Sequence, residues 1–232
     1  MFRDFLKRFG SANPTSSLAG GDPESTDSVS LPRPYNDEAR DLLYNLLFCD
    51  HPELFRSKTQ RSSVGDLLND PAADASQVQA IADDAGEESR YRALAFRWLR
   101  EHGTAIPSKL LLGVIVEVPQ EGGLDTLAAF EDGRIRYINQ SGRMASFETA
   151  PPDIETKARA LIAAARAAVE QIGLWDKARL PPPSSGVRVT FVVSDGLCFG
   201  EGPWDAIAND SIGGPVLKCA TELLVHITES AK

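Results

Sequence analysis

Residues 110–148 read LLLGVIVEVPQEGGLDTLAAFEDGRIRYINQSGRMASFE, and this stretch decides the predicted fold. It opens with an apolar run that ends at Pro119. The run is too apolar for a strand with one face in water, and it is far shorter than the roughly 18 residues of a membrane helix. We therefore expect a central strand that is covered on both faces.

Glycine turns divide the rest of this stretch into three shorter strands. A glycine pair at 122–123 ends the central strand, and an Asp-Gly pair at 132–133 separates LDTLAAF from RIRYI. Asp-Gly accommodates the positive φ angles that a tight hairpin requires. A second turn at 139–142 precedes a short strand at 143–148. We expect consecutive antiparallel hairpins whose strands are not deeply buried on both sides.

Helical patterns flank the predicted sheet. Helices are predicted at 87–102, at 154–172 and from residue 213 to residue 227, with two more strands between the last two helices. The absence of βαβ alternation indicates an α+β fold: an antiparallel sheet of about five to six strands with flanking helices, preceded by a helical N-terminal region and a disordered leash. A helix that begins near Asn36 is expected to bury one apolar face, formed by Ala39, Leu42, Leu43, Leu46 and Leu47.

The chain of 232 residues divides into four predicted segments. Residues 1–10 form an amphipathic docking helix, and residues 11–34, rich in Ser, Pro, Gly and Asp, form a disordered linker. Residues 35–105 form a helical region packed on the main domain, and residues 106–232 form the α+β sheet domain.

The first nine residues carry the strongest functional signal. Phe2, Phe5, Leu6 and Phe9 recur at i, i+3, i+4 and i+7, with basic residues on the remaining surface. So short a helix is marginal in water until it binds something. It could dock in a groove of a partner protein, lie on an anionic membrane surface as a peripheral contact, or pack on its own domain.

Charge and cysteine content exclude several classes of protein. A net charge of −9 argues against a nucleic-acid-binding surface, which needs clustered Lys and Arg. The three cysteines show neither a disulfide framework nor zinc-ligand spacing. Because the N-terminus also lacks the pattern of a secretory signal, we predict a cytoplasmic protein.

Side chains that could carry chemistry are scattered along the chain. The Cys-Asp-His at 49–51 follows a helix C-terminus, where the helix dipole disfavours a thiolate. Cys198, Cys219 and His226 lack the paired, closely spaced ligands of structural zinc sites. We therefore prefer a structural role for each of these residues.

Two glycine-containing segments could offer backbone amides to an anion, at 200–202 and 213–215. Turn chemistry is a sufficient explanation for both. Trp204 lies between them and is a candidate surface anchor, because tryptophan is enriched at interface centres. We predict no catalytic residue, no metal site and no cofactor.

These observations predict a non-enzymatic adaptor or regulatory protein-binding module that is recruited through its amphipathic N-terminal helix. Two alternatives stay open: a small enzyme whose site is assembled from distant residues, and an immunity-type inhibitor of a basic protein. We also predict self-association into a homo-oligomer, through a sheet edge left unpaired or through a helix face. The expected partner contacts are Phe2, Phe5, Leu6, Phe9 and Trp204.

Overall fold

The computed structural model describes residues 31–35, 37–48, 50–55, 64–175, 177 and 179–230. The predicted docking helix lies outside the described residues, and so does the predicted linker up to residue 30. The last residues of that linker are described, and the carbonyl of Pro32 accepts a hydrogen bond of 2.8 Å from the side-chain amide of Asn45. The chain is therefore bonded to its folded body from Pro32 onwards.

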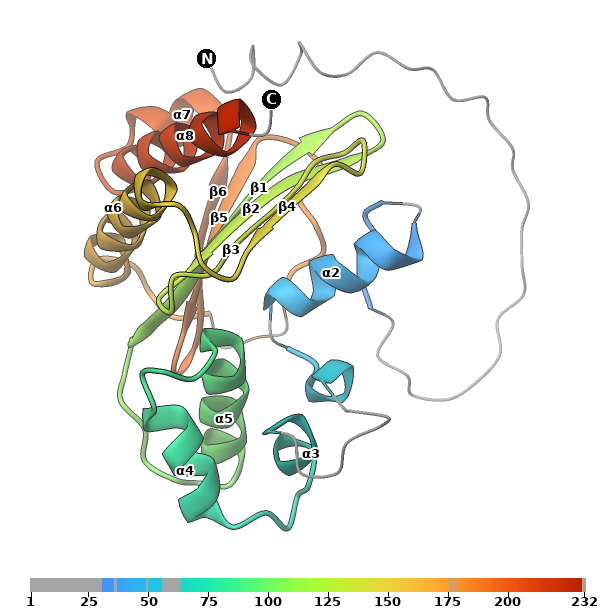
Figure 1. Cartoon of the computed structure of the whole chain (residues 1–232). Helices are drawn as coiled ribbons and strands as arrows, with labels where there is room; N and C mark the ends of the chain where they lie inside the picture. Colours follow the sequence, from blue (N-terminus) through green and yellow to red (C-terminus); the bar gives the residue numbers. More distant parts are fainter. Residues whose placement is uncertain are drawn as a thin grey trace.

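A six-stranded sheet forms the centre of the fold, in the order β4-β3-β2-β1-β5-β6 (Figure 1). Every neighbouring pair is antiparallel, which confirms the predicted α+β class. The predicted central strand is β1, which lies between β2 and β5. The strands are β1 (Leu111–Gln120), β2 (Gly123–Phe130), β3 (Ile135–Ile138), β4 (Met144–Phe147), β5 (Val187–Val193) and β6 (Gly196–Gly202).

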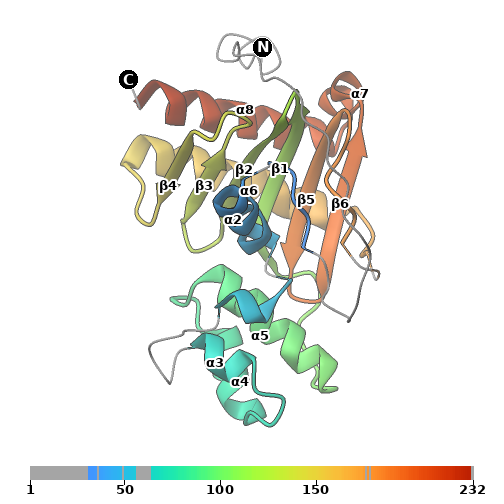
Figure 2. The same ribbon diagram turned by 90° about the vertical axis from the view of Figure 1, so that its right-hand side faces the viewer.

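Helices cover both faces of the sheet and one of its ends. α6 (Pro152–Val169) and α8 (Gly213–Ser230) lie side by side on one face, with the short α7 (Trp204–Asn209) against α8. α2 (Glu38–Phe48) lies across the opposite face (Figure 2). At one end of the sheet lie the 3₁₀ turn η1 (Pro52–Phe55), α3 (Val64–Leu68), α4 (Ala75–Asp83) and α5 (Ser89–Glu101). Among the helices in these described ranges, none is both long and apolar enough to cross a bilayer.

Strand β1 is buried on both faces, as its apolar run predicts. Val114 and Val116 pack in the core shared with α6 and α8, whereas Leu112 and Ile115 pack in the core shared with α2 and α5. Between them, a Cβ atom on residue 113 would lie 2.6 Å from the ring of Phe130. Glycine is therefore required where that ring crosses the strand.

The hairpin of β2 and β3 differs from its prediction in two ways. Its turn holds one residue in the left-handed region, Gly133, with φ of 87°, rather than the two that a type I′ turn needs. The expectation of shallow burial was also wrong, because every residue of β2 after Gly123 is buried. The reason is that the two cores lie on opposite faces of this strand.

Helix α2 turns a different face toward the sheet from the one predicted. Leu42 is 46% exposed and Ala39 is exposed, whereas Asp41, Tyr44 and Asn45 are buried. The predicted apolar face was therefore wrong for Ala39 and Leu42, although Leu47 is buried and Leu43 packs against the core. The physical reason is that the sheet face beneath α2 carries polar side chains, and these need hydrogen-bond partners from the helix.

Candidate functional site

A carboxyl group lies at the centre of the sheet beneath α2. Glu117 of β1 is 0% exposed. The hydroxyl of Tyr44 donates a 2.8 Å hydrogen bond to its Oε1, while Oε2 has no hydrogen-bond partner among the described residues. Burial raises the pKa of Glu117 from 4.5 to about 7, although the bond from Tyr44 and the nearby arginines oppose that shift.

Glu117 belongs to a row of polar side chains that crosses the sheet. Thr126 of β2 and Arg188 of β5 are its cross-strand neighbours, and Glu201 of β6 is the neighbour of Arg188. Nη2 of Arg188 lies 2.6 Å from Glu201, and Nη1 lies 4.0 Å from Oε2 of Glu117. The hydroxyls of Tyr35 and Thr126 lie 2.8 Å apart. The segment containing α2 thus meets this row through hydrogen bonds as well as through apolar contact.

The connector between α6 and β5 meets the end of α2 through Arg179. Its Nε lies 3.1 Å from Oδ2 of Asp50, and its Nη2 donates a 2.8 Å hydrogen bond to Oδ1 of Asn45. Its guanidinium also lies 4.1 Å from the centroid of the Phe48 ring. Burial raises the pKa of Asp50, and the charge of Arg179 opposes that rise. Arg179 therefore fastens the connector to α2.

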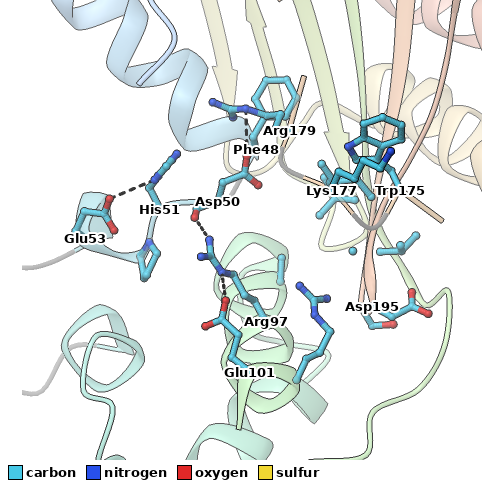
Figure 3. Close-up of a pocket in the computed structure, with 18 of the residues that line it drawn as sticks. Phe48, Asp50, His51, Glu53, Arg97, Glu101, Trp175, Lys177, Arg179 and Asp195 are labelled. Atoms are coloured by element: carbon cyan, nitrogen blue, oxygen red, sulfur yellow. Dashed lines mark hydrogen bonds and ion pairs between the residues drawn. The ribbon is translucent and has the colours of Figure 1, made fainter. Parts of the chain in front are cut away.

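A cleft of about 830 Å³ opens beside Arg179 (Figure 3). Five parts of the chain line it: Pro32 ahead of α2, the end of α2 with η1, α5, the connector, and the turn between β5 and β6 with its flanking strand residues. Trp175, Val192 and Leu197 supply apolar lining. This volume lies within the range of sites that hold a small ligand.

The carboxylates that line the cleft are already engaged within the protein. Each lies within ion-pair or hydrogen-bond distance of a donor. Asp50 and Glu101 each face an arginine, whereas the donors to Asp195 are a neutral hydroxyl and a backbone amide, which leave its negative charge in place. In Figure 3, Asp50 lies between Arg179 and Arg97. The pairs are Asp50 with Arg179 (3.1 Å), Glu53 with His51 (3.3 Å), Glu101 with Arg97 (2.8 Å), and Asp195 with the Ser108 hydroxyl (2.7 Å) and the Lys109 amide (2.9 Å).

Two cations at the cleft form no ion pair with the described residues. Arg100 of α5 and Lys177 of the connector are both exposed, and neither has an anionic partner among the residues that the structure describes. Nζ of Lys177 lies 5.5 Å from the centroid of the Trp175 ring. The ring of Trp175 in turn contacts that of Phe199 edge to face, with centroids 5.2 Å apart. The cleft thus combines charged side chains of both signs with an aromatic surface.

The turn between β5 and β6 is fixed by its own side chains. The Ser194 hydroxyl donates to the carbonyl of Pro107 at 2.6 Å and accepts a hydrogen bond from the amide of Leu110 at 3.1 Å. With the Asp195 bonds described above, this holds the turn against the loop that follows α5. One wall of the cleft is therefore held in place by side-chain hydrogen bonds.

The predicted partner contacts do not lie at this cleft. Trp204 begins α7 and is partly buried against the core of α6 and α8, on the face of the sheet opposite α2. Phe2, Phe5, Leu6 and Phe9 lie outside the described residues. A role in partner binding for these five residues stays a prediction.

The histidine and cysteines considered as metal ligands have separate surroundings. Cys198 is buried in the core with α6 and α8, and burial raises the pKa of its thiol. Nδ1 of His226 lies 3.0 Å from the carbonyl of Glu222 on its own helix, α8, which also carries Cys219. Throughout the described ranges, no three His, Cys, Asp or Glu side chains gather as metal ligands.

The remaining candidate segments are explained by local structure. Cys49 lies outside the described residues, while its neighbours Asp50 and His51 line the cleft. The glycine segment at 200–202 is part of β6 rather than a loop. At the start of α8, the carboxylate of Asp210 accepts a hydrogen bond from the backbone amide of Gly213 at 2.7 Å. A carboxylate of the protein itself therefore already occupies the position that an anion would take.

Sequence reasoning missed the residues that organise this region. Glu117 did leave a signal, because it is the only charged residue in the run from Leu110 to Pro119. Arg100, Lys177 and Arg179 left none, because they come from separate segments that only the fold brings together.

Comparison with models of known protein families yields no match, and comparison with curated proteins yields no related sequence.

Proposed function

We propose that this protein is a non-enzymatic adaptor or regulatory protein-binding module, recruited to a partner protein through its N-terminal segment and acting in the cytoplasm. The observation that carries the proposal is the spacing of Phe2, Phe5, Leu6 and Phe9, ahead of a stretch without apolar periodicity. Such an arrangement holds a helix-in-groove ligand on a tether beside a folded body. The cleft gives that body a concave surface of its own.

The test compares affinity capture by the full chain with capture by two matched triple variants. One replaces Phe2, Phe5 and Phe9 with alanine, and the other replaces the basic residues at positions 3, 7 and 8 with glutamine. A protein partner in an apolar groove is lost with the alanine variant and kept with the glutamine variant. Equal recovery of every captured protein by all three chains would contradict the proposal.

The same variants distinguish the other surfaces to which this helix could bind. Binding to anionic vesicles that falls with both variants would identify a membrane contact. A lower unfolding midpoint for the alanine variant would identify packing on the protein's own body. An inhibitor of a basic protein would instead bind through acidic surface that none of these substitutions removes.

A small enzyme is the second candidate, and one observation favours it. The pKa of Glu117 is raised to about 7, and perturbed carboxyl groups cluster at catalytic sites. Glu117 is 0% exposed, so a substrate could reach it only after α2 moved away. Turnover by the full chain in a screen of hydrolase and isomerase substrates, abolished by Glu117→Gln, would support this candidate.

A further inference from the structure

We propose that Arg188 of β5 is a charge-controlled latch for the connector: it holds the carbonyl of Pro181 until Glu117 ionises, and its Nη1 then moves to Oε2 of Glu117. The connector also carries Trp175 and Arg179, which line the cleft. The latch therefore places one wall of the cleft under the control of a carboxyl group that lies beneath α2. It belongs to the folded body, so it does not depend on what the N-terminal segment binds.

The contacts of Arg188 carry the first step. Its Nε and Nη2 lie 2.7 Å and 2.6 Å from Oε2 of Glu201, and its Nη1 donates a 2.8 Å hydrogen bond to the carbonyl of Pro181. The same Nη1 lies 4.0 Å from Oε2 of Glu117. The side chain of Arg188 is 6% exposed, so water does not compete freely for its N–H groups. One buried guanidinium thus lies between three acceptors, of which the carbonyl is the one that carries no charge in any state.

The second oxygen of Glu117 carries the second step. Glu117 is 0% exposed, its Oε1 accepts the hydroxyl of Tyr44, and its Oε2 has no hydrogen-bond partner among the described residues. Leaving this oxygen without a donor costs more when it is charged, because a buried charge needs a partner. A hydrogen bond needs about 2.9 Å, so Nη1 of Arg188 has roughly one ångström to travel.

The other ionisable side chains around Glu117 have contacts of their own. In the described part of the chain, the titratable and charged groups that face Glu117 are Tyr35 ahead of α2, Tyr44 of α2, Arg179 of the connector, Arg188 of β5 and Glu201 of β6. The hydroxyl of Tyr35 lies 2.8 Å from that of Thr126, and Arg179 pairs with Asp50. Glu201 repels a charge on Glu117. Arg188, at 4.0 Å from Oε2, is therefore the donor that an ionised Glu117 recruits.

The competition between a carboxylate and a carbonyl carries the third step. A hydrogen bond to an ionised acceptor is roughly twice as strong as one to a neutral acceptor. The guanidinium is a planar, rigid fork whose other two donors stay on Glu201, so turning Nη1 toward Glu117 turns it away from Pro181. The hydrogen bond from Tyr44 strengthens at the same time, because its acceptor gains charge. Helix α2 therefore stays on the sheet while the connector loses its bond at Pro181.

Burial sets the pH at which the latch opens. It raises the pKa of Glu117 to about 7, so the carboxyl is neutral at pH 5 and largely charged at pH 8. The bond between Arg188 and Pro181 is therefore made at pH 5 and lost at pH 8.

The test uses the full chain and two variants that each remove one buried carboxyl group. Glu117→Gln keeps the shape of the side chain but never ionises. The matched control is Asp125→Asn, because burial also raises the pKa of Asp125, to about 6, while its Oδ1 accepts the backbone amide of Gln140 rather than a group of the connector. Amide hydrogen exchange of residues 174–186 is measured by mass spectrometry at pH 5 and at pH 8. Chains are compared at the same pH, so the intrinsic pH dependence of exchange cancels.

We expect the connector of the unmutated chain to exchange roughly threefold faster, or more, than that of Glu117→Gln at pH 8, and at the same rate at pH 5. The connector of Asp125→Asn should exchange as in the unmutated chain at both pH values. Equal exchange in the unmutated chain and Glu117→Gln at pH 8 would overturn the proposal. Equal slowing in both variants would also overturn it, because this would show a change in overall stability rather than a latch.

A second measurement reads the latch itself on the unmutated chain. Carbon-13 resonances of the Glu117 carboxyl and the Pro181 carbonyl are followed from pH 5 to pH 8, and we expect both to move with one midpoint. In Glu117→Gln the Pro181 resonance should stay fixed. A Pro181 resonance that also stays fixed in the unmutated chain would overturn the proposal, even if the connector exchanged faster at pH 8.

Discussion

Glu117 shows how one residue ties the stability of this fold to pH. Its carboxyl is fully buried and its pKa rises from 4.5 to about 7. The folded chain therefore holds this proton more tightly than the unfolded chain does. The stabilisation is complete below pH 4.5 and is lost as the pH rises through 7, on the order of 3 kcal/mol in total.

The substitution Glu117→Gln should flatten this dependence. Glutamine keeps an oxygen for the Tyr44 hydroxyl but never carries the charge, so the variant should gain stability relative to the unmutated chain as the pH rises from 5 to 8. Urea unfolding at several pH values measures this. Asp125→Asn is a useful comparison, because burial raises the pKa of Asp125 to about 6 and its contribution has the same sign. Parallel stability curves for the unmutated chain and Glu117→Gln would contradict this interpretation.

Arg179 is the second residue whose contacts are specific enough to measure. A double-mutant cycle with Arg179→Gln and Asp50→Asn should give a coupling energy of about 1–3 kcal/mol, because the pair is largely removed from water. The same cycle on Arg159 and Glu155 of α6, an exposed pair, should give almost none. Equal coupling in the two cycles would mean that Arg179 does not fasten the connector to α2.

At the scale of elements, α2 is the helix whose packing is set by polar groups. Tyr44→Phe removes the donor to Glu117 and should cost about 1–3 kcal/mol. The cost should be greater at pH 8 than at pH 5, because an ionised carboxylate then loses its donor. Leu42→Glu should change the free energy of unfolding by less than about 0.5 kcal/mol, because this side chain is 46% exposed. If chemical denaturation showed that Leu42→Glu lowers the free energy of unfolding more than Tyr44→Phe does, the leucine face of α2 would be the buried one.

The contrast between α2 and the C-terminal helices explains what the sequence could predict. The apolar stripes of α6 and α8 are buried as their periodicity indicates, because both helices pack on a largely apolar sheet face. Helix α2 packs on the row that contains Glu117 and Arg188, so its buried side carries Tyr44 and Asn45. Periodicity describes a helix alone and does not reveal the surface that it meets.

The cleft was beyond sequence reasoning for a related reason. Arg100 and Lys177 are 77 positions apart in the sequence, and no local pattern links them. The hairpins of β1 to β4 were predictable because each is a local unit bounded by turn residues. Sites assembled from distant segments depend on tertiary packing instead.

At the scale of the whole molecule, the open edge of the sheet is a place for self-association. Strand β4 ends the sheet, and Met144 on it is 56% exposed. We expect the mass measured by light scattering to rise with concentration, and Met144→Lys to suppress that rise, because charge on an edge strand opposes pairing. A monomer mass for both chains up to high micromolar concentration would contradict this.

Whether the N-terminal segment serves recruitment rather than folding is tested most directly by the thermal unfolding midpoint of the chain without residues 1–30. The cut is placed there because the carbonyl of Pro32 bonds to Asn45 of α2. If the first nine residues serve a partner, the midpoint should stay within about 1 °C of that of the full chain. If these four apolar side chains packed on the body, they would contribute several kcal/mol to its stability. Each kcal/mol lost would lower the unfolding midpoint by about 2–4 °C. A fall on the order of 10 °C would therefore show that Phe2, Phe5, Leu6 and Phe9 belong to the protein's own core.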